Sequence, residues 1–362
     1  MDNAFWPPAE FREALENDGP ISKWVRNVQT KLHWEQFEKF SVPVTENKTE
    51  FDSSYVVSPY SALILYSRQE MKKLPNYLQA LELILSPLAD LLKFMKLNQA
   101  VSVNNWLLST NLYPKDSIDQ LATLASKTIQ VSPQSFVIFR SLNYFTNAGL
   151  IEKLKRLGFT LIPSRQVYFF DFKDEITIEY RNLFRDQKLL VQTKLKISEG
   201  FEFSQDDFER AEQLYNLLYL DKYSIYNPAF TSDFLKLCQR TQVMKLFGLR
   251  SSDGTLQGVV GFFIVDGVMT VPIVGYDTNR PQKEGLYRLL MAFALRYAKD
   301  EKLLVNLSSG ASRFKMFRGG KPVIEYSAVY MRHLSWHRRL SFRLIQLLLF
   351  SIALPLLKIF KL

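Results

Sequence analysis

The chain contains one cysteine and three histidines among its 362 residues. A single cysteine excludes an intramolecular disulfide and gives no sign of an oxidising compartment. Four such side chains leave little material for a zinc site, and we expect no metal. The sequence also lacks a Walker A loop, HExxH, GxSxG and GxGxxG. The usual signatures of nucleotide hydrolysis, zinc proteolysis and serine hydrolysis are therefore missing.

Long apolar runs are missing as well. No stretch of about 18 or more uninterrupted apolar residues occurs, so the sequence predicts no confident membrane span. The opening MDNAFWPPAEF has an acid at position 2 and lacks the apolar core of a signal peptide. We therefore expect a cytoplasmic protein. With 47% hydrophobic and 23% charged residues, the chain can bury a substantial core and is not a disordered tail.

The net charge of +10 is unevenly distributed. Residues 332–362 hold six basic and no acidic side chains, which leaves +4 for the first 331 residues. A nucleic-acid binding protein would spread its excess charge over a folded face, so this pattern disfavours that class. The remainder is a nearly balanced globular body with a basic, apolar tail.

Within that tail, Leu344 to Leu357 is apolar except for Gln346, Ser351 and Pro355. As a helix it would span about 21 Å, against about 30 Å for the hydrocarbon core of a bilayer. Shallow insertion into an anionic cytoplasmic leaflet fits this length, with these side chains near the headgroups: Arg338, Arg339, Arg343, Lys358 and Lys361. Packing on the protein's own body or on a dimer partner, and a spanning helix from Leu340 to Leu362, remain alternatives.

Apolar periodicity predicts an α/β chain in which strands and helices alternate. Strands are expected over 55–67, 101–110, 136–143, 160–172, 189–197, 243–251, 258–265, 268–276 and 303–309, and helices over 77–97, 116–127, 147–157, 204–219, 231–240 and 285–300. Ser204 with Asp207 resembles a capping box, and Thr231 can cap the helix that follows it. Asp253-Gly254 and Asp266-Gly267 predict hairpin turns.

A spaced repeat indicates two related halves. Lys153-x2-Arg-x-Gly-x3-Ile-x4-Val-Tyr168 recurs with identical spacing as Lys315-x2-Arg-x-Gly-x3-Ile-x4-Val-Tyr330. In both places the pattern runs from a predicted helix through a glycine into a predicted strand. We therefore expect domains at 1–178 and 179–333, followed by a helical tail at 334–362.

The stretch 268–309 predicts a strand, a polar loop, a helix and a strand. Unpaired N–H groups and a partial positive charge at a helix N-terminus suit a phosphate group. In the loop Arg280–Tyr287, Arg280 and Lys283 add cations, and Gly285 permits close approach of the backbone. The alternative is a solvated loop in which Gly285 only begins the helix.

At this loop the sequence resembles the GNAT acyltransferases, and particularly their tandem-domain relatives of the FemAB type. The family pattern Gln/Arg-x-x-Gly-x-Gly/Ala matches Gln282-x-x-Gly285-x-Tyr287 except at its last place. The resemblance covers about residues 185–331, and the first half resembles a degenerate copy. It implies two tandem GNAT-like domains, each with a mixed, mostly antiparallel sheet flanked by helices. It also implies acyl-CoA as co-substrate, held by these residues: Arg280, Gln282, Lys283, Glu284, Gly285, Leu286 and Tyr287.

The resemblance further implies catalytic positions at the end of the central strand. GNAT-like enzymes use a carboxylate and often a tyrosine there, which points to Asp277 and Tyr276, with Glu284 and Tyr326 as alternatives. Asp277 could equally cap a turn. Lys315 matches a basic position before the last strand of FemAB-like relatives, where it could hold a carbonyl or an anionic acceptor; it could also be an exposed helix lysine.

The acceptor-binding region implied by the resemblance falls on 219–230 and on the last strand. The residues are Lys222, Tyr223, Asn227 and Tyr326. Asn227-Pro228 is also ordinary turn chemistry. Cys238 lies on an apolar helical stripe and is expected to be a buried thiol.

We therefore expect an acyltransferase that moves an acyl group from acyl-CoA to an amine at the cytoplasmic face of the membrane, peripherally bound. One alternative is a FemAB-type transferase that uses aminoacyl-tRNA and a cell-wall or lipid acceptor. No long coiled-coil-like insertion is present in the second half, which counts against it. A second alternative is a membrane-docked binding module without catalysis.

Overall fold

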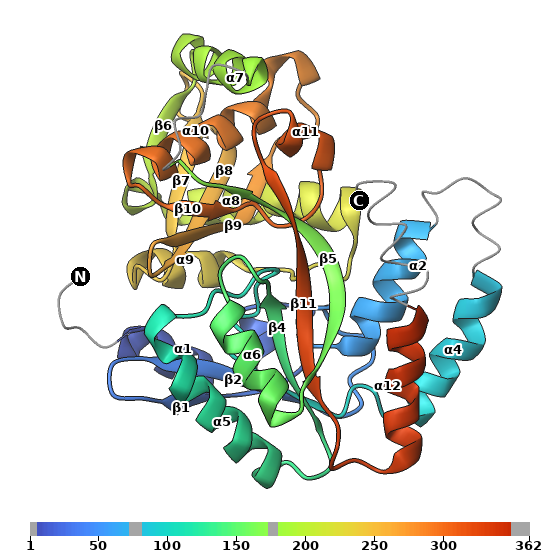
Figure 1. Ribbon diagram of the computed structural model, residues 1–362. Coiled ribbons are helices and arrows are strands. Elements are labelled where there is room, and N and C mark those ends of the chain that lie inside the picture. The colour runs from blue at the N-terminus through green and yellow to red at the C-terminus, as the bar shows by residue number, and fades with distance from the viewer. Residues whose placement is uncertain (1–5, 72–81, 173–179, 349–362) are drawn as a thin grey trace.

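In a computed structural model, residues 6–71, 82–172 and 180–348 are described. They form a mixed α/β protein around one sheet (Figure 1). The strands are β1 (Lys31–Gln36), β2 (Ser41–Asn47), β3 (Ala100–Val103), β4 (Phe136–Leu142), β5 (Thr160–Phe170), β6 (Lys196–Glu199), β7 (Lys245–Arg250), β8 (Leu256–Val265), β9 (Val268–Tyr276), β10 (Leu304–Asn306) and β11 (Lys321–Tyr330).

Helices lie around this sheet. The α-helices are α1 (Ala9–Asn17), α2 (Tyr66–Met71), α4 (Glu82–Phe94), α5 (Ile118–Val131), α6 (Ala148–Leu157), α7 (Arg181–Gln192), α8 (Gln205–Asn216), α9 (Ser232–Arg240), α10 (Leu286–Asp300), α11 (Ser312–Met316) and α12 (Trp336–Leu348). Two π-helical segments, η2 (Ser61–Leu65) and η5 (Leu217–Tyr223), precede α2 and follow α8. In Figure 1, α2, α4 and α12 gather on one side.

The strand order is β1-β2-β3-β4-β11-β5-β10-β9-β8-β7-β6. We call residues up to 172 the first half and residues 180–330 the second half. The last strand of each half lies inside the other: β11 separates β4 from β5, and β5 separates β10 from β11. The long antiparallel β5–β11 ribbon runs through the middle of the molecule and joins the halves (Figure 1). The domain boundaries expected at 178 and 333 remain a prediction.

The sequence repeat coincides with this exchanged ribbon. Its first copy runs through α6 into β5 and its second through α11 into β11. Ile162 of β5 pairs with Ser327, while the equivalent Ile324 of β11 pairs with Gln166. The two copies therefore lie antiparallel and nearly symmetric about the middle of the ribbon.

Each half also contains one pair of parallel strands that separates at the ribbon. In the first half, β3 and β4 pair until Val103 meets Phe139. In the second half, β9 and β10 pair until Thr270 meets Asn306, and β9 then continues to Tyr276 paired with β8 on its other edge. The chain therefore opens on both sides of the ribbon, at equivalent places.

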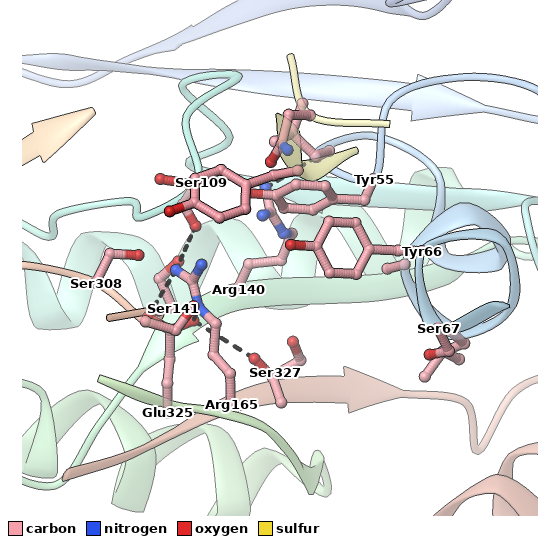
Figure 2. A pocket seen from close by; sticks show the side chains of 18 of the residues that line it. Tyr55, Tyr66, Ser67, Ser109, Arg140, Ser141, Arg165, Ser308, Glu325 and Ser327 are labelled. Carbon is pink, nitrogen blue, oxygen red and sulfur yellow. Dashed lines mark hydrogen bonds and ion pairs between the residues drawn. The ribbon is translucent and has the colours of Figure 1, made fainter. Parts of the chain in front are cut away.

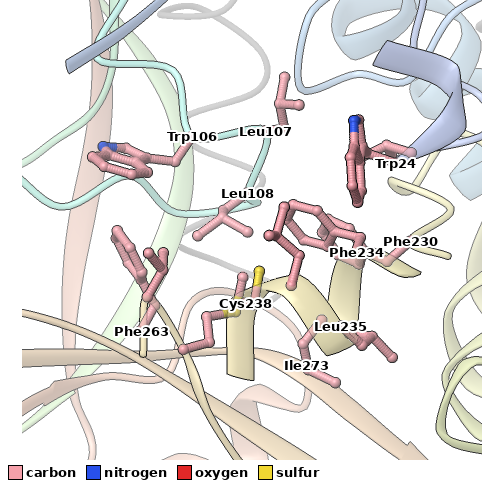
Figure 3. Packing of buried hydrophobic residues seen from close by; sticks show 14 of the residues in the cluster. Trp24, Trp106, Leu107, Leu108, Phe230, Phe234, Leu235, Cys238, Phe263 and Ile273 are labelled. Atoms are coloured by element: carbon pink, nitrogen blue, oxygen red, sulfur yellow. The ribbon is translucent and has the colours of Figure 1, made fainter. Parts of the chain in front are cut away.

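Large apolar side chains fill the space between the sheet and the helices. Figure 3 shows one cluster, in which Cys238 of α9 packs among aromatic and leucine side chains. This thiol is fully buried, which confirms the expected position and raises its pKa well above the ordinary value. Thr231 caps α9 by accepting the N–H of Phe234, and Ser204 and Asp207 form the predicted capping box of α8.

Two expected strands are wrong. Residues 55–67 form a turn that leads into η2 and α2, because Ser58 accepts the N–H of Ser61 and Pro59 suits the first turn of a helix. Residues 189–197 end the amphipathic helix α7 and only then enter β6. Helix α7 packs along α10, where Gln187 donates to the carbonyl of Ala292.

Candidate active-site cavity

A cavity of about 570 Å³ lies where the two strand pairs separate (Figure 2). The ribbon supplies its floor, with Ile162–Arg165 of β5 and Glu325 and Ser327 of β11. Its walls come from both halves, and the two π-helical segments η2 and η5 also line it. π-Helical turns inside helices are frequent at functional sites.

The two walls differ in chemistry. The first-half wall consists of Ser102, Ser109, Arg140 and Ser141, on and beside β3 and β4. The second half contributes an apolar patch of Val271, Val274, Met291 and Leu307, on β9, on α10 and after β10, next to the polar residues Asn227, Ser308, Ser309 and Lys315. The serines and Arg140 therefore suit polar or charged groups, and the apolar patch suits a hydrocarbon chain or a thioester.

The floor carries a buried ion pair. Arg165 and Glu325 are direct partners across the ribbon, and Nε of Arg165 donates to Oε1 of Glu325 at 2.8 Å. Nη2 of Arg165 also donates to the carbonyl of Ser109 and to the hydroxyl of Thr110. Burial is the largest single influence on the pKa of Arg165 and lowers it, but the charge and hydrogen bond of Glu325, together with Tyr55 and Tyr66, make the net shift upward.

Lys315 of α11 is buried with its ammonium group at the cavity. Nζ donates to three backbone carbonyls, those of Leu307 at 2.7 Å, Ser308 at 3.2 Å and Ser309 at 2.8 Å. Burial and the nearby Arg165 lower its pKa to about 7. The three carbonyls favour the protonated form, because a neutral amine has only two N–H groups to donate. Lys315 therefore fixes the loop after β10.

The backbone of that loop is unusual. Ser308 and Ala311 have φ values of 59° and 46°, which non-glycine residues rarely adopt, and both line the cavity. Ser141 has φ 64°; it lies within β4, two residues past the last β3–β4 pair, as Ser308 lies two residues past the last β9–β10 pair. Strained backbone of this kind clusters at functional sites, and here it faces the cavity from both halves.

Tyrosines surround the opening above the floor. Tyr55 and Tyr66 make an edge-to-face contact with ring centroids 5.4 Å apart, and Tyr219 and Tyr223 of η5 lie 6.0 Å apart. Tyr287 of α10 also lines the cavity, and burial raises its pKa. These rings give the cavity an aromatic rim with hydroxyl groups.

Four of the residues predicted for the site line this cavity: Lys315, Tyr223, Asn227 and Tyr287. Asn227 is buried, and its amide donates to the carbonyls of Tyr219 and Ser224. The turn chemistry that was the alternative for Asn227 is thus present. The functional roles of these four residues remain predictions.

The other predicted residues lie outside the cavity lining. Asp277 pairs with Arg210 at 3.0 Å and accepts the N–H of Asn279, as a turn cap would. Tyr276 ends β9. Lys222 is exposed, and Tyr326 packs against Tyr144 with ring centroids 5.9 Å apart.

The loop before α10 is mostly exposed. Within it, Arg280 pairs with Glu284 at 2.6 Å, so this cation is already partly neutralised. Gly285 begins α10 with φ 68°, and Leu189 of α7 lies 3.1 Å from where a Cβ would stand. Gln282 and Lys283 are exposed, whereas Leu286 is buried. Lys283 forms no ion pair within the described part of the chain. Lys283 and the backbone around Gly285 fit a phosphate better than Arg280 does.

The sequence interpretation missed the charged residues of the cavity: Arg140, Arg165 and Glu325. Each stands inside a mostly apolar strand, in FVIFRSL, TLIPSRQVYFF and KPVIEYSAVY. Because a charge inside a buried strand is costly, such a residue has either a partner or a ligand. That signal was available in the sequence.

The tail prediction is wrong for one residue. Arg338 is buried, and its guanidinium donates to the carbonyls of Met95, Lys96 and Gln134, so it cannot reach headgroups. Arg343 is exposed and Arg339 half-buried. Lys358, Lys361 and most of the apolar run lie outside the described residues. No described helix is long and apolar enough to cross a bilayer, and no three potential metal ligands gather in the described ranges.

No protein-family model matches the sequence, and no curated protein matches it. Solved structures do resemble it. They include the C-terminal domain of a proposed lysylphosphatidylglycerol synthetase from Agrobacterium fabrum, at 12% identity over 64% of this chain and 78% of that one, with a TM-score of 0.49. FemX aligns at 7% identity over 64% and 79%, with a TM-score of 0.46. A tandem GNAT protein from the clavulanic acid pathway aligns at 11% over 64% and 75%, with a TM-score of 0.37.

The chain is a mixed α/β protein, as the sequence predicts, and GNAT and FemX structures are among those that resemble it. Likeness at this level concerns the fold alone. What the chain does must therefore be argued from its own cavity.

Proposed function

We propose that the chain is an N-acyltransferase that transfers an acyl group to an amine acceptor inside the cavity. The observation that carries this proposal is the separation of β9 from β10 after Thr270 and Asn306, with an apolar wall and the start of α10 beside it. An extended acyl donor can lie between separated strands, because their unpaired backbone groups can bind it. The helix entrance at Gly285 can then receive the donor's phosphates.

The transfer forms a C–N bond and breaks the bond between the acyl carbon and its leaving group. The amine must lose a proton, and the leaving sulfur or oxygen must gain one. Tyr223 and Tyr287 line the cavity, and their hydroxyl groups could transfer the proton from the amine to the leaving group. Lys315 holds the carbonyls of the loop after β10 and so positions that wall; its predicted direct contact with a carbonyl or an acceptor remains part of the proposal.

Acyl-CoA is the donor that the resemblance implies. When bound, it supplies an activated thioester. Lys283 and the backbone at Gln282 and Gly285 would hold its pyrophosphate, while Arg280 would first have to exchange its contact with Glu284. For Asp277 to act as the catalytic carboxylate that the sequence predicts, its ion pair with Arg210 would have to break. Tyr276 would act from the end of β9.

An aminoacyl-tRNA is the second candidate donor, and one observation favours it. Tyr287 stands where the GNAT loop has glycine or alanine, and its ring packs 4.9 Å from Phe314 and 6.2 Å from Tyr276. A buried aromatic ring at this place weakens tight wrapping of a pyrophosphate. The ester of an aminoacyl-tRNA would need no such wrapping.

We also propose that the acceptor or product is lipidic and that the protein works at an anionic membrane surface on the cytoplasmic side. Phe342 and Ile345 of α12 line the cavity, so its apolar end adjoins the helix that leads into the tail. Exposed Arg343 on the same helix would face headgroups. Sedimentation with phosphatidylglycerol and with phosphatidylcholine vesicles tests this, and equal binding to both would contradict it.

The transfer itself is tested by single-turnover assays with radiolabelled acyl-CoA and with radiolabelled aminoacyl-tRNA, each with a panel of amines. Ser327→Trp fills the cavity from its floor, and Thr123→Trp on the exposed face of α5 is the matched control. We expect transfer from one donor by wild type and by the control, and at least a hundredfold loss in Ser327→Trp. No transfer from either donor, with vesicle binding retained, would favour a non-catalytic module.

A further inference from the structure

The charges that line the cavity do not balance. Its lining contains three cationic side chains, Arg140, Arg165 and Lys315, and one carboxylate, Glu325. Arg165 and Glu325 compensate each other directly, and the ammonium of Lys315 is held by three carbonyls. Arg140 has no carboxylate partner among the described residues. A buried or half-buried cation without a counter-charge is costly, which suggests that a ligand supplies one.

Arg140 is held in a fixed orientation at the first-half wall. Its Nη1 donates to the carbonyl of Val56 at 2.8 Å and to Oδ1 of Asn105 at 3.0 Å, and the guanidinium lies 6.0 Å from the ring of Tyr55. Within the described chain, its Nε and Nη2 have no recorded protein acceptor. An arginine fixed on one side and free on the other presents ready-made donors to a planar or tetrahedral oxyanion.

Hydroxyl groups surround this arginine (Figure 2). Ser102, Ser109 and Ser141 line the same wall, and Ser327 faces it from the ribbon. The oxygen of Ser141 accepts the N–H of Asn111, so its O–H remains able to donate. The second-half side offers an apolar patch and Lys315, whose ammonium already donates to three carbonyls, so the anionic end of a ligand is better placed near Arg140.

We propose that Arg140 and the serines of the first-half wall bind an oxyanion, a carboxylate or a phosphate, of the ligand that occupies this cavity. The identification of that ligand as the acceptor rests on the proposed function, but the oxyanion site does not. An acceptor with an amine at the second-half wall and an oxyanion near Arg140 would bridge the cavity. The positive charge of Arg140 matches one negative charge of the ligand, and Lys315 is a further cation in the same cavity lining.

Binding is measured without any acyl donor, so failure of acyl transfer leaves this test unaffected. Full-length protein is titrated by calorimetry with glycerol 3-phosphate and with glutarate, against potassium chloride at equal ionic strength. We expect saturable binding of at least one anion, and the preferred probe tells a phosphate source from a carboxylate source. The titration extends to about 20 mM of each anion, which covers the dissociation constants of weak binding sites. If neither anion binds more strongly than the chloride control, the proposal is overturned.

Arg140→Gln is the variant that removes the charge, and exposed Arg156→Gln on α6 is the control with the same charge change. We expect Arg140→Gln to weaken binding at least about tenfold, as loss of a charge-assisted hydrogen bond does, while Arg156→Gln leaves it unchanged. Equal affinity in the two variants would overturn the proposal.

If Arg140→Gln does not fold, the wild-type protein still decides. Phenylglyoxal labels accessible arginines, and mass spectrometry of the Arg140 peptide reports its modification with and without the bound anion. We expect protection of Arg140 and none of Arg156. Absence of protection at saturating anion would contradict the site.

Discussion

Neutralising Glu325 should destabilise the protein, because Arg165 at the cavity floor then loses its counter-charge. Glu325 is 2% exposed and, among the described residues, is the only carboxylate that lines the cavity, opposite Arg165. Removing one partner of a buried ion pair costs about 3–5 kcal/mol. The side chain of Arg165 is 19% exposed through the cavity, and the amide of Glu325→Gln still accepts one hydrogen bond, so we expect the lower end, about 3 kcal/mol.

This loss of stability can be measured as a shift in the midpoint of thermal unfolding, Tm. With an unfolding entropy of about 2.1 cal/mol/K per residue, a loss of about 3 kcal/mol in a chain of this length lowers Tm by about 4 °C. Glu152→Gln is the control, because Glu152 pairs with Lys155 at the surface, with both side chains about half exposed, and should cost less than about 0.5 kcal/mol. Differential scanning calorimetry and urea unfolding measure both variants.

The same variant also tests the charge argument. Without Glu325, the cavity gains one more unbalanced cation, so glycerol 3-phosphate or glutarate should raise Tm more in Glu325→Gln than in wild type. The loss of stability caused by Glu325→Gln should be smaller when Arg165→Gln is already present, because Glu325 then has no charged partner to lose. A Glu325→Gln protein as stable as Glu152→Gln, or a cost unchanged in the Arg165→Gln background, would refute the reasoning.

Three further predictions concern residues singled out in the sequence. Burial lowers the pKa of Lys315 from 10.5 to about 7, so between these pH values the unfolded chain binds more protons at this residue than the folded one. The free energy of unfolding of wild type, relative to that of Lys315→Met, should therefore rise with pH across this window. A constant difference between the two proteins in urea unfolding at pH 6, 8 and 10 would contradict this prediction. Gly285→Val should cost about 1–2 kcal/mol, because φ is 68° and Leu189 is close, and an unchanged urea midpoint would be the opposite result. Asp277→Asn should cost less than about 1 kcal/mol, since the pair with Arg210 is partly exposed, and should change the transfer rate less than threefold; a hundredfold loss would restore a catalytic role.

Local patterns predicted the second half well. The alternation of strand, hairpin turn and strand over 243–276 is read directly from periodicity, and Asp266 and Gly267 both adopt the positive φ that the hairpin requires. Capping residues gave the starts of α8 and α9 correctly. These features depend on interactions within a few residues, which one sequence contains.

Long-range pairing was beyond such patterns. The repeat indicated two related halves but not that β5 and β11 exchange places, because pairing between strands 160 residues apart leaves no local signal. The segment 55–67 has the composition of a strand, yet tertiary contacts make it helical. The cavity was missed for the same reason: Arg140 and Glu325 become neighbours of one site only when both halves meet at the ribbon.

The central claim is that an acyl group is transferred within the cavity between the two separated strand pairs. The most direct measurement is the single-turnover rate of labelled acyl or aminoacyl transfer to an amine, compared between Ser327→Trp and Thr123→Trp. We predict that Thr123→Trp keeps the wild-type rate and that Ser327→Trp loses at least a hundredfold. Equal rates in the two variants, with both folded, would contradict the claim.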